Sequence, residues 1–170
     1  MTPEFSRLID VRQTGGKSMK IEAEEAERAA LAKRFGIVRI DRLRADLELS
    51  RKNHEVEVCG RMVADLVQPC AVTTEELPVS IDEPVYVRFV PERTDYAPDE
   101  ELELDAEDCD EIEYGGSHID VGEAVAQSLA LAIDPFLTGP NADAARKAAG
   151  IGTPEEHGAF AALKGLKLGK

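Results

Sequence analysis

Hydrophobic and polar residues alternate in three successive stretches of the chain. In "RLRADLELS", residues 42–50, leucine and alanine occupy every second position and charged residues stand between them. The same period of two recurs over 55–67 and over 78–90. Because neighbouring side chains of a β-strand point to opposite faces, the pattern predicts strands with one buried face. Short polar links join the three stretches, which predicts an antiparallel meander.

Single residues in these stretches predict local features. The link 51–54 contains Asn53, which tolerates the left-handed backbone region, so we expect a hairpin turn there. Gly60 interrupts the apolar series of its strand and indicates a bulge or a closely packed helix. Pro84 indicates an edge position or a bulge, because proline cannot donate to a strand ladder.

Two longer segments have the composition of helices. Residues 22–35 are rich in alanine and glutamate, with acidic side chains early and basic ones late, as the helix dipole favours. Residues 120–134 begin with Asp120 and Glu123 in the spacing of a capping box. Both segments carry an apolar stripe that a sheet would bury.

The fold class follows from these elements together with short strands expected over 5–11 and 111–119. The sequence predicts an α+β fold, in which an antiparallel β-meander sheet of about four or five strands is packed on one face by the two main helices. We expect a single domain over 1–140, followed by a short helix and a basic C-terminal tail over 141–170.

Charge is distributed unevenly along the chain. The formal net charge of the 170 residues is −14. Residues 92–113 hold twelve acidic side chains against Arg93 alone, whereas residues 1–62 hold 13 basic and 11 acidic side chains. This contrast predicts a near-neutral domain with one long acidic loop on its rim.

Several classes of protein are disfavoured by the composition. No stretch approaches the roughly 20 apolar residues that span a bilayer, and the N-terminus lacks the pattern of a secretory signal. Three cysteines without a CxxC spacing fit a reducing compartment, and three scattered histidines disfavour a zinc site. We therefore expect a cytoplasmic protein with no membrane contact, no metal, no cofactor and no small-molecule substrate.

Cys70 lies in "LVQPCAVTTEEL", where an alternating apolar stretch ends. Its position raises three interpretations: a nucleophile, a metal ligand, or a small residue at a turn between two strands. A catalytic cysteine needs a neighbouring base and a lowered thiol pKa. No histidine stands in a recognised relation to Cys70, so the third interpretation is favoured.

The residues around Cys70 also carry a resemblance. The strand ending in "ADLVQPCAVTTEELPVSI", the later "RFVP", the acidic stretch, "HIDVGEAVAQSLALAIDPF" and the closing "FAALKGLK" occur in this order. This series resembles the YceD-like family of large ribosomal RNA subunit accumulation proteins, most closely its α-proteobacterial form. The resemblance runs over nearly the whole chain.

The resemblance implies a cytoplasmic, non-enzymatic protein needed for the synthesis, processing or stability of large-subunit ribosomal RNA. Some members carry a second cysteine three positions after the first, a pair that could hold a metal ion. Thr73 stands at that position here. The resemblance therefore assigns Cys70 neither a metal nor a catalytic task.

Direct RNA contact needs clustered basic side chains, because binding releases counterions from phosphates. A net charge of −14 argues against a general RNA binder, but a local cluster can still make contact. Arg42 and Arg44 alternate with Asp46 and Glu48, so an ordinary solvated sheet face is the alternative. Further lysines lie in the tail. The RNA-contact candidates are Arg39, Arg42, Arg44, Arg51, Lys52 and Arg61.

A second hypothesis uses the acidic segment. The chain would then be an acidic adaptor or chaperone that binds a basic ribosomal protein without touching RNA, since complementary charge speeds encounter. A solvated loop without any partner is the alternative. The partner-docking candidates are Asp99, Glu100, Glu101, Glu103, Asp105, Glu107 and Asp108.

An enzymatic interpretation is a two-metal nuclease or paired-carboxylate hydrolase. The acidic residues suffice in number, but they crowd into one segment that does not hold them in a fixed geometry. We therefore do not expect an enzyme.

Overall fold

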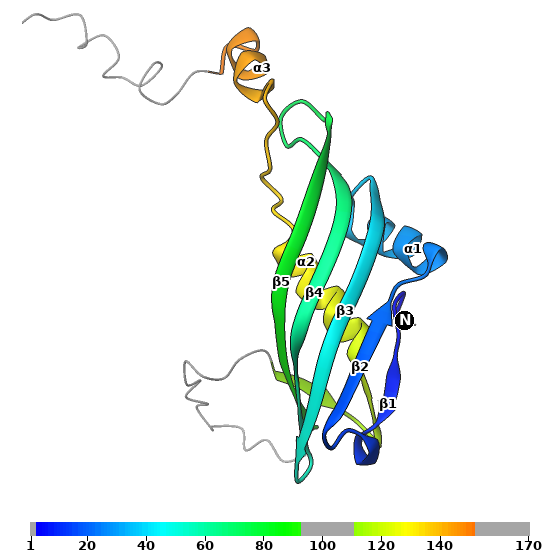
Figure 1. The fold of residues 1–170 in the computed structure, drawn as a ribbon. Helices are drawn as coiled ribbons and strands as arrows, with labels where there is room; N and C mark the ends of the chain where they lie inside the picture. Colours follow the sequence, from blue (N-terminus) through cyan, green and yellow to red (C-terminus); the bar gives the residue numbers. More distant parts are fainter. Residues whose placement is uncertain (1–2, 93–110, 152–170) are drawn as a thin grey trace, which may run out of the picture. The chain divides into compact units, whose positions relative to one another are not determined.

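The computed structural model describes residues 3–92 and 111–151, and these form a mixed α+β structure (Figure 1). Its main element is a five-stranded sheet in the order β2-β3-β4-β5-β6. The strands are β2 (Lys17–Glu22), β3 (Arg39–Lys52), β4 (Glu55–Pro69), β5 (Glu76–Pro91) and β6 (Glu111–Tyr114). The predicted fold class is confirmed.

A second sheet has two antiparallel strands, and helices complete the structure. The small sheet pairs β1 (Leu8–Asp10) with β7 (His118–Asp120). The helices are α1 (Glu25–Phe35), α2 (Val121–Ala132) and α3 (Ala142–Ala148), with a 3-10 turn, η1, at Val11–Gln13.

The chain divides into two compact units. Among the described residues, the first unit comprises 3–68, 78–92 and 111–134, and the second comprises 69–77 and 135–151. The second unit therefore contains the turn between β4 and β5 and also α3. The division into a domain over 1–140 and a tail over 141–170 stays a prediction.

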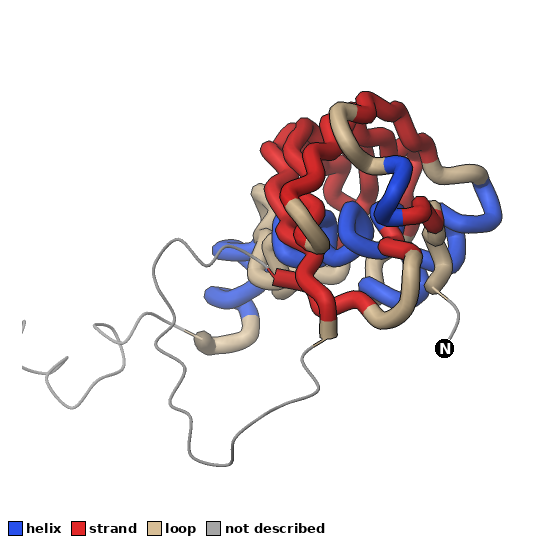
Figure 2. Tube along the Cα trace, turned by 90° about the horizontal axis from the view of Figure 1, so that it is seen from below, coloured by secondary structure: helices blue, strands red, loops and turns tan. Residues whose placement is uncertain are grey.

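The core of the first unit lies between one face of the large sheet and α2. Both views place α2 on that side of the sheet (Figures 1 and 2). Alternate residues of β3 and β4 are buried, as the period of two predicts. Fully buried side chains include Leu43, Leu47, Val56, Val58 and Met62 of the sheet and Val121, Val125 and Leu129 of α2.

The local predictions on the long strands have mixed outcomes. Asn53 has a φ of 60° in the turn between β3 and β4, which confirms the hairpin turn. Pro84 lies outside Arg88–Pro91, the part of β5 that pairs with β6, which agrees with an edge position. The prediction of a bulge at Gly60 is wrong, because Gly60 pairs with Leu47 inside the continuous register of β3 and β4. Its backbone instead packs so closely on β3 that an added Cβ would overlap the carbonyl oxygen of Asp46.

Two segments differ from the prediction. Residues 17–22 form β2, which pairs with β3, and α1 begins only at Glu25. The single last strand expected over 111–119 is wrong, because Gly116 has a φ of 79° and the chain turns between two strands. The first, β6, runs parallel to β5, and the second, β7, pairs with β1.

Candidate functional site

The side of the large sheet away from α2 carries alternating charges, and we call it the outer face. The Nη2 atom of Arg42 lies 2.7 Å from the Oδ2 atom of Asp65, and Lys20 Nζ lies 2.9 Å from Asp46 Oδ1. The strand register explains this arrangement, because Arg42 stands opposite Asp65 and Lys20 opposite Asp46. Opposite charges that face each other across strands stabilise a sheet.

Neighbouring pairs extend this pattern across the outer face. The guanidinium of Arg61 binds Asp82 of β5. Hydrogen bonds from Ser80 and from Arg61 are the largest causes of the lowered pKa values of Asp65 and Asp82 respectively, and the charge of Arg44 lowers both pKa values further. Positive and negative side chains are therefore interleaved over this face.

The six RNA-contact candidates fall into three places. Arg42, Arg44 and Arg61 share the outer face. Arg39 lies at the start of β3, with its Nε atom 3.0 Å from Asp41 Oδ1. Arg51 and Lys52 lie at the far end of β3, where Arg51 donates to the carbonyl of Val11 in η1. The structure thus brings three of the six together and separates the others from them.

The seven partner-docking candidates and the tail lysines lie outside the described residues, but the flanks of the acidic segment are described. Pairing in parallel, β5 and β6 place Glu111 opposite Arg88, and their side chains form an ion pair of 3.0 Å. The backbone N–H of Glu92 donates to the carbonyl of Tyr114. Both ends of the acidic segment are therefore fixed at one strand edge.

Cys70 occupies a buried turn of the second unit, with 2% of its surface exposed. Its sulfur accepts hydrogen bonds from the backbone N–H groups of Val72 and Thr73, both at 3.4 Å, and of Gly139 at 3.3 Å. These donors, led by Gly139, and the Thr73 hydroxyl favour the thiolate and lower the pKa of Cys70 to about 7. The thiol joins the turn to the segment before α3.

This geometry fits the turn interpretation of Cys70. The carboxylate of Glu75, in the same turn, accepts hydrogen bonds from the side-chain amide of Asn141 at 2.6 Å and from the Thr73 hydroxyl at 2.8 Å, and these bonds lower its pKa. Among residues 3–92 and 111–151, no three metal-ligating side chains come together. Cys59, the other described cysteine, is exposed, and desolvation and two nearby glutamates raise its pKa.

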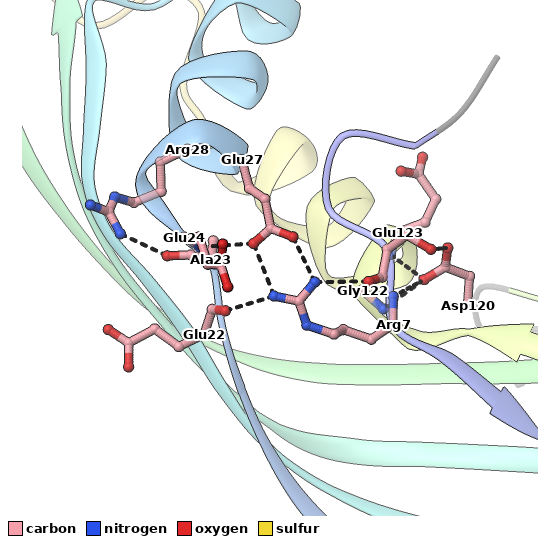
Figure 3. A network of polar contacts seen from close by, with 10 residues as sticks. Arg7, Glu22, Ala23, Glu24, Glu27, Arg28, Asp120, Gly122 and Glu123 are labelled. Carbon is pink, nitrogen blue, oxygen red and sulfur yellow. Dashed lines mark hydrogen bonds and ion pairs between the residues drawn. The ribbon is translucent and has the colours of Figure 1, made fainter.

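A polar network that sequence analysis missed joins the N-terminal segment to both main helices (Figure 3). The Arg7 guanidinium donates two bonds to the Glu27 carboxylate, at 2.6 and 2.9 Å, and one to the carbonyl of Glu22 at 3.0 Å. The backbone N–H of Arg7 donates to Asp120, which also accepts from the N–H of Gly122 at the start of α2. The ion pair raises the pKa of Arg7 and lowers that of Glu27.

A second bidentate pair lies beside this network. Arg34 of α1 donates to both carboxylate oxygens of Glu123 at 2.9 and 2.8 Å, and to Glu4 at 2.9 Å. Its guanidinium lowers the pKa of Glu123. The capping-box spacing had singled out Glu123, but no local signal indicates partners 89 residues away in the sequence.

The fold and these sites define a mixed α+β protein with an ion-paired sheet face and a buried structural thiol. The family model described as large ribosomal RNA subunit accumulation protein YceD matches residues 58–167, from β4 onward. The chain therefore belongs to the YceD family, and the resemblance seen in the sequence is confirmed; its α-proteobacterial form stays a prediction. The searches of curated proteins and of solved structures found no match.

No helix in the described part of the chain is both long and apolar enough to cross a membrane.

Proposed function

We propose that this protein is a cytoplasmic, non-enzymatic ribosome-biogenesis factor that supports the synthesis, processing or stability of large-subunit ribosomal RNA. The observation that carries this proposal is the match of the family model over residues 58–167. The description of that family names accumulation of the RNA as the affected quantity. Whether the protein acts on synthesis, processing or stability of this RNA is decided by the experiment that follows.

The test is the amount of ribosomal RNA in cells from which the protein is removed. We expect large-subunit ribosomal RNA to fall relative to small-subunit ribosomal RNA, and to recover when the full chain is supplied again. Precursor RNA measured in the same cells separates slow processing from rapid decay. An unchanged ratio of the two RNAs in depleted cells contradicts the proposal.

The mode of action has two forms, and the first is direct contact with the RNA or its precursor through the six basic candidates. Arg44, Arg51 and Lys52 form no ion pair with a carboxylate among the described residues, which supports this form. Arg39, Arg42 and Arg61 each bind a carboxylate, so a phosphate would have to displace Asp41, Asp65 or Asp82.

The second form is an acidic adaptor that binds a basic ribosomal protein. The interleaved charges of the outer face and the net charge of −14 favour it. Complementary charge would speed encounter with a basic partner. In this form residues 99–108 dock the partner, and RNA accumulation follows from correct delivery of that protein.

The second form is tested with a variant in which the seven acidic candidates are changed to asparagine or glutamine. We expect salt-sensitive binding to a basic ribosomal protein by the wild-type chain, and loss of that binding in the variant. The matched control exchanges Asp and Glu at the same seven positions, which keeps the charge. If the control loses binding as fully as the neutral variant, charge is not the determinant.

A further inference from the structure

A groove of about 500 Å³ lies between α1 and the start of β3, and we call it the α1 groove. Ala29 and Ala32 of α1, which we call its floor, line the groove together with Val38. Arg28 and Lys33 also line it. Five helical residues correspond to about 7.5 Å along the axis and roughly 140° around it, so these two cations flank the alanine floor.

The two cations of the α1 groove differ from those of the outer face in their partners. Arg28 donates from Nη1 to the carbonyl of Ala23 at 2.7 Å, which positions the guanidinium without neutralising its charge. Lys33 has no carboxylate within ion-pair distance in the part of the chain that the structure describes. By contrast, Arg34, the next residue, is held by Glu4 and Glu123.

The remaining charges of the α1 groove leave a positive excess. Arg39 and Asp41 both line the groove and pair with each other at 3.0 Å. Glu25, in the first turn of α1, is the one other acidic residue of the lining. Arg28 and Lys33 together therefore outweigh Glu25, and an anion that enters meets a net positive site.

The lining of the α1 groove fits a sugar–phosphate backbone better than an acidic peptide. A docked peptide needs deep apolar pockets for anchoring side chains. Here Val38, 41% exposed, is the one large apolar side chain of the lining that is exposed, whereas Ala32 and Ile40 are 4% and 5% exposed. Small floor residues between two cations admit a phosphate and its sugar, and contacts of this kind position a nucleic acid without reading its sequence.

We propose that the α1 groove binds the phosphate backbone of large-subunit ribosomal RNA, with Arg28 and Lys33 contacting phosphates on either side of Ala29 and Ala32. This inference rests on the proposed function, because the family description supplies the RNA as the anion. No aromatic side chain lines the groove. Stacking on bases is therefore absent from the contact, and binding depends on salt more than on sequence.

The test compares two lysines in the last turn of a helix. Lys33→Glu changes the groove, and Lys147→Glu makes the same change in the last turn of α3, outside it. The full chain is titrated against a fluorescein-labelled uridylate strand of about 20 nucleotides, and against a transcript of large-subunit ribosomal RNA. We expect about tenfold weaker binding for Lys33→Glu, with the salt slope reduced by about one, and less than about twofold change for Lys147→Glu.

A second variant guards against a fold defect. Arg28→Gln keeps a hydrogen-bond donor for the Ala23 carbonyl and removes the charge. It should weaken RNA binding by about fivefold with little change in thermal unfolding. Arg28→Lys, which keeps the charge, should bind within about twofold of wild type.

Three outcomes overturn the α1 groove as an RNA site. The first is an equal loss of RNA affinity in Lys33→Glu and Lys147→Glu. The second is unchanged RNA affinity in both Lys33→Glu and Arg28→Gln, and the third is no RNA binding by the wild-type chain. Displacement of bound RNA by a poly-glutamate peptide at equal charge, together with tighter binding of that peptide, would assign the groove to an acidic protein instead. In each case the ratio of ribosomal RNAs in depleted cells still reports on the proposed function separately.

Discussion

Gly122→Ala is expected to destabilise the protein, although helix propensity predicts the opposite. Gly122 lies in the first turn of α2 and is buried. A Cβ added there would lie 2.6 Å from the carbonyl oxygen of Phe5 and 2.8 Å from the backbone nitrogen of Arg7. Both atoms belong to the backbone, so the steric overlap can be removed only if the N-terminal segment or α2 shifts.

The size of the effect follows from two opposing contributions. Glycine in a helix interior costs about 1 kcal/mol relative to alanine, and less in a first turn. Overpacking a close contact costs about 1–3 kcal/mol. The segment near Gly122 cannot yield cheaply, because the backbone N–H of Arg7 donates to Asp120 at 2.8 Å and the N–H of Val121 donates to the carbonyl of Arg7 at 3.2 Å. We expect a net loss of about 2 kcal/mol.

The assay is unfolding in urea, followed by circular dichroism. Two control variants separate propensity from packing. Ala130→Gly, at an exposed position of the same helix, should lose about 1 kcal/mol, which shows that propensity operates in α2. Gly15→Ala, where no atom lies within 4 Å of the added Cβ, should be neutral or slightly stabilising. If Gly122→Ala proves as stable as the wild-type chain, the close packing of α2 on the N-terminal segment is refuted.

Three further predictions test other parts of the structure. The Cys70 thiol, measured by thiolate absorbance in a chain whose other cysteines are serine, should ionise near pH 7. Because the pKa of Cys70 is lowered in the folded protein, its ionisation should increase the free energy of unfolding as the pH rises from 7 to 9. A titration midpoint near pH 9 would contradict the hydrogen bonds to the sulfur. Arg34→Met should lower the free energy of unfolding by about 1–2 kcal/mol at pH 7. Because the pair lowers the pKa of Glu123, the difference in stability between the variant and the wild-type chain should shrink below about pH 4.5. A difference that stays constant down to pH 2 would argue against the ion pair. Gly60→Ala should lose about 3 kcal/mol in urea unfolding, because its Cβ would meet the carbonyl oxygen of Asp46, and retention of wild-type stability would contradict the close approach of β3 and β4.

The long strands were predictable because a buried face imposes a period of two. The alternation in 42–50 and 55–67 set the inward residues of β3 and β4 correctly. The strand β2 was not predicted, because Ile21 is its one fully buried residue and its neighbours are polar or half-exposed. Its structure depends on pairing with β3, and pairing is not visible in a short polar sequence.

Long-range partners explain the remaining differences. The parallel pairing of β6 with β5 depends on how the chain returns after Pro91, and no local pattern encodes that return. The donor from Gly139 to Cys70 comes from 69 residues along the chain. The sequence around Cys70 therefore predicted the turn, but it could not predict the groups that lower the pKa of the thiol.

The candidate cations show the same limit for function. Alternation placed Arg42, Arg44 and Arg61 on one face correctly, because period alone decides the face. Whether a cation is neutralised depends on register across strands. Arg42 meets Asp65 because both lie in the register that pairs β3 with β4 continuously from Arg42 to Lys52. Counting charges along the chain could not reveal this pairing.

Register also decides where an anion can bind at low cost. A phosphate that approaches Arg42 competes with Asp65 at 2.7 Å, and the displaced carboxylate would remain beside the new anion. Lys33 in the α1 groove has no carboxylate within ion-pair distance among the described residues. A phosphate can therefore interact with Lys33 without displacing a carboxylate, as it would have to do at Arg42. If a chain with a net charge of −14 contacts RNA, we therefore expect the α1 groove to bind phosphate at lower electrostatic cost than Arg42 of the outer face.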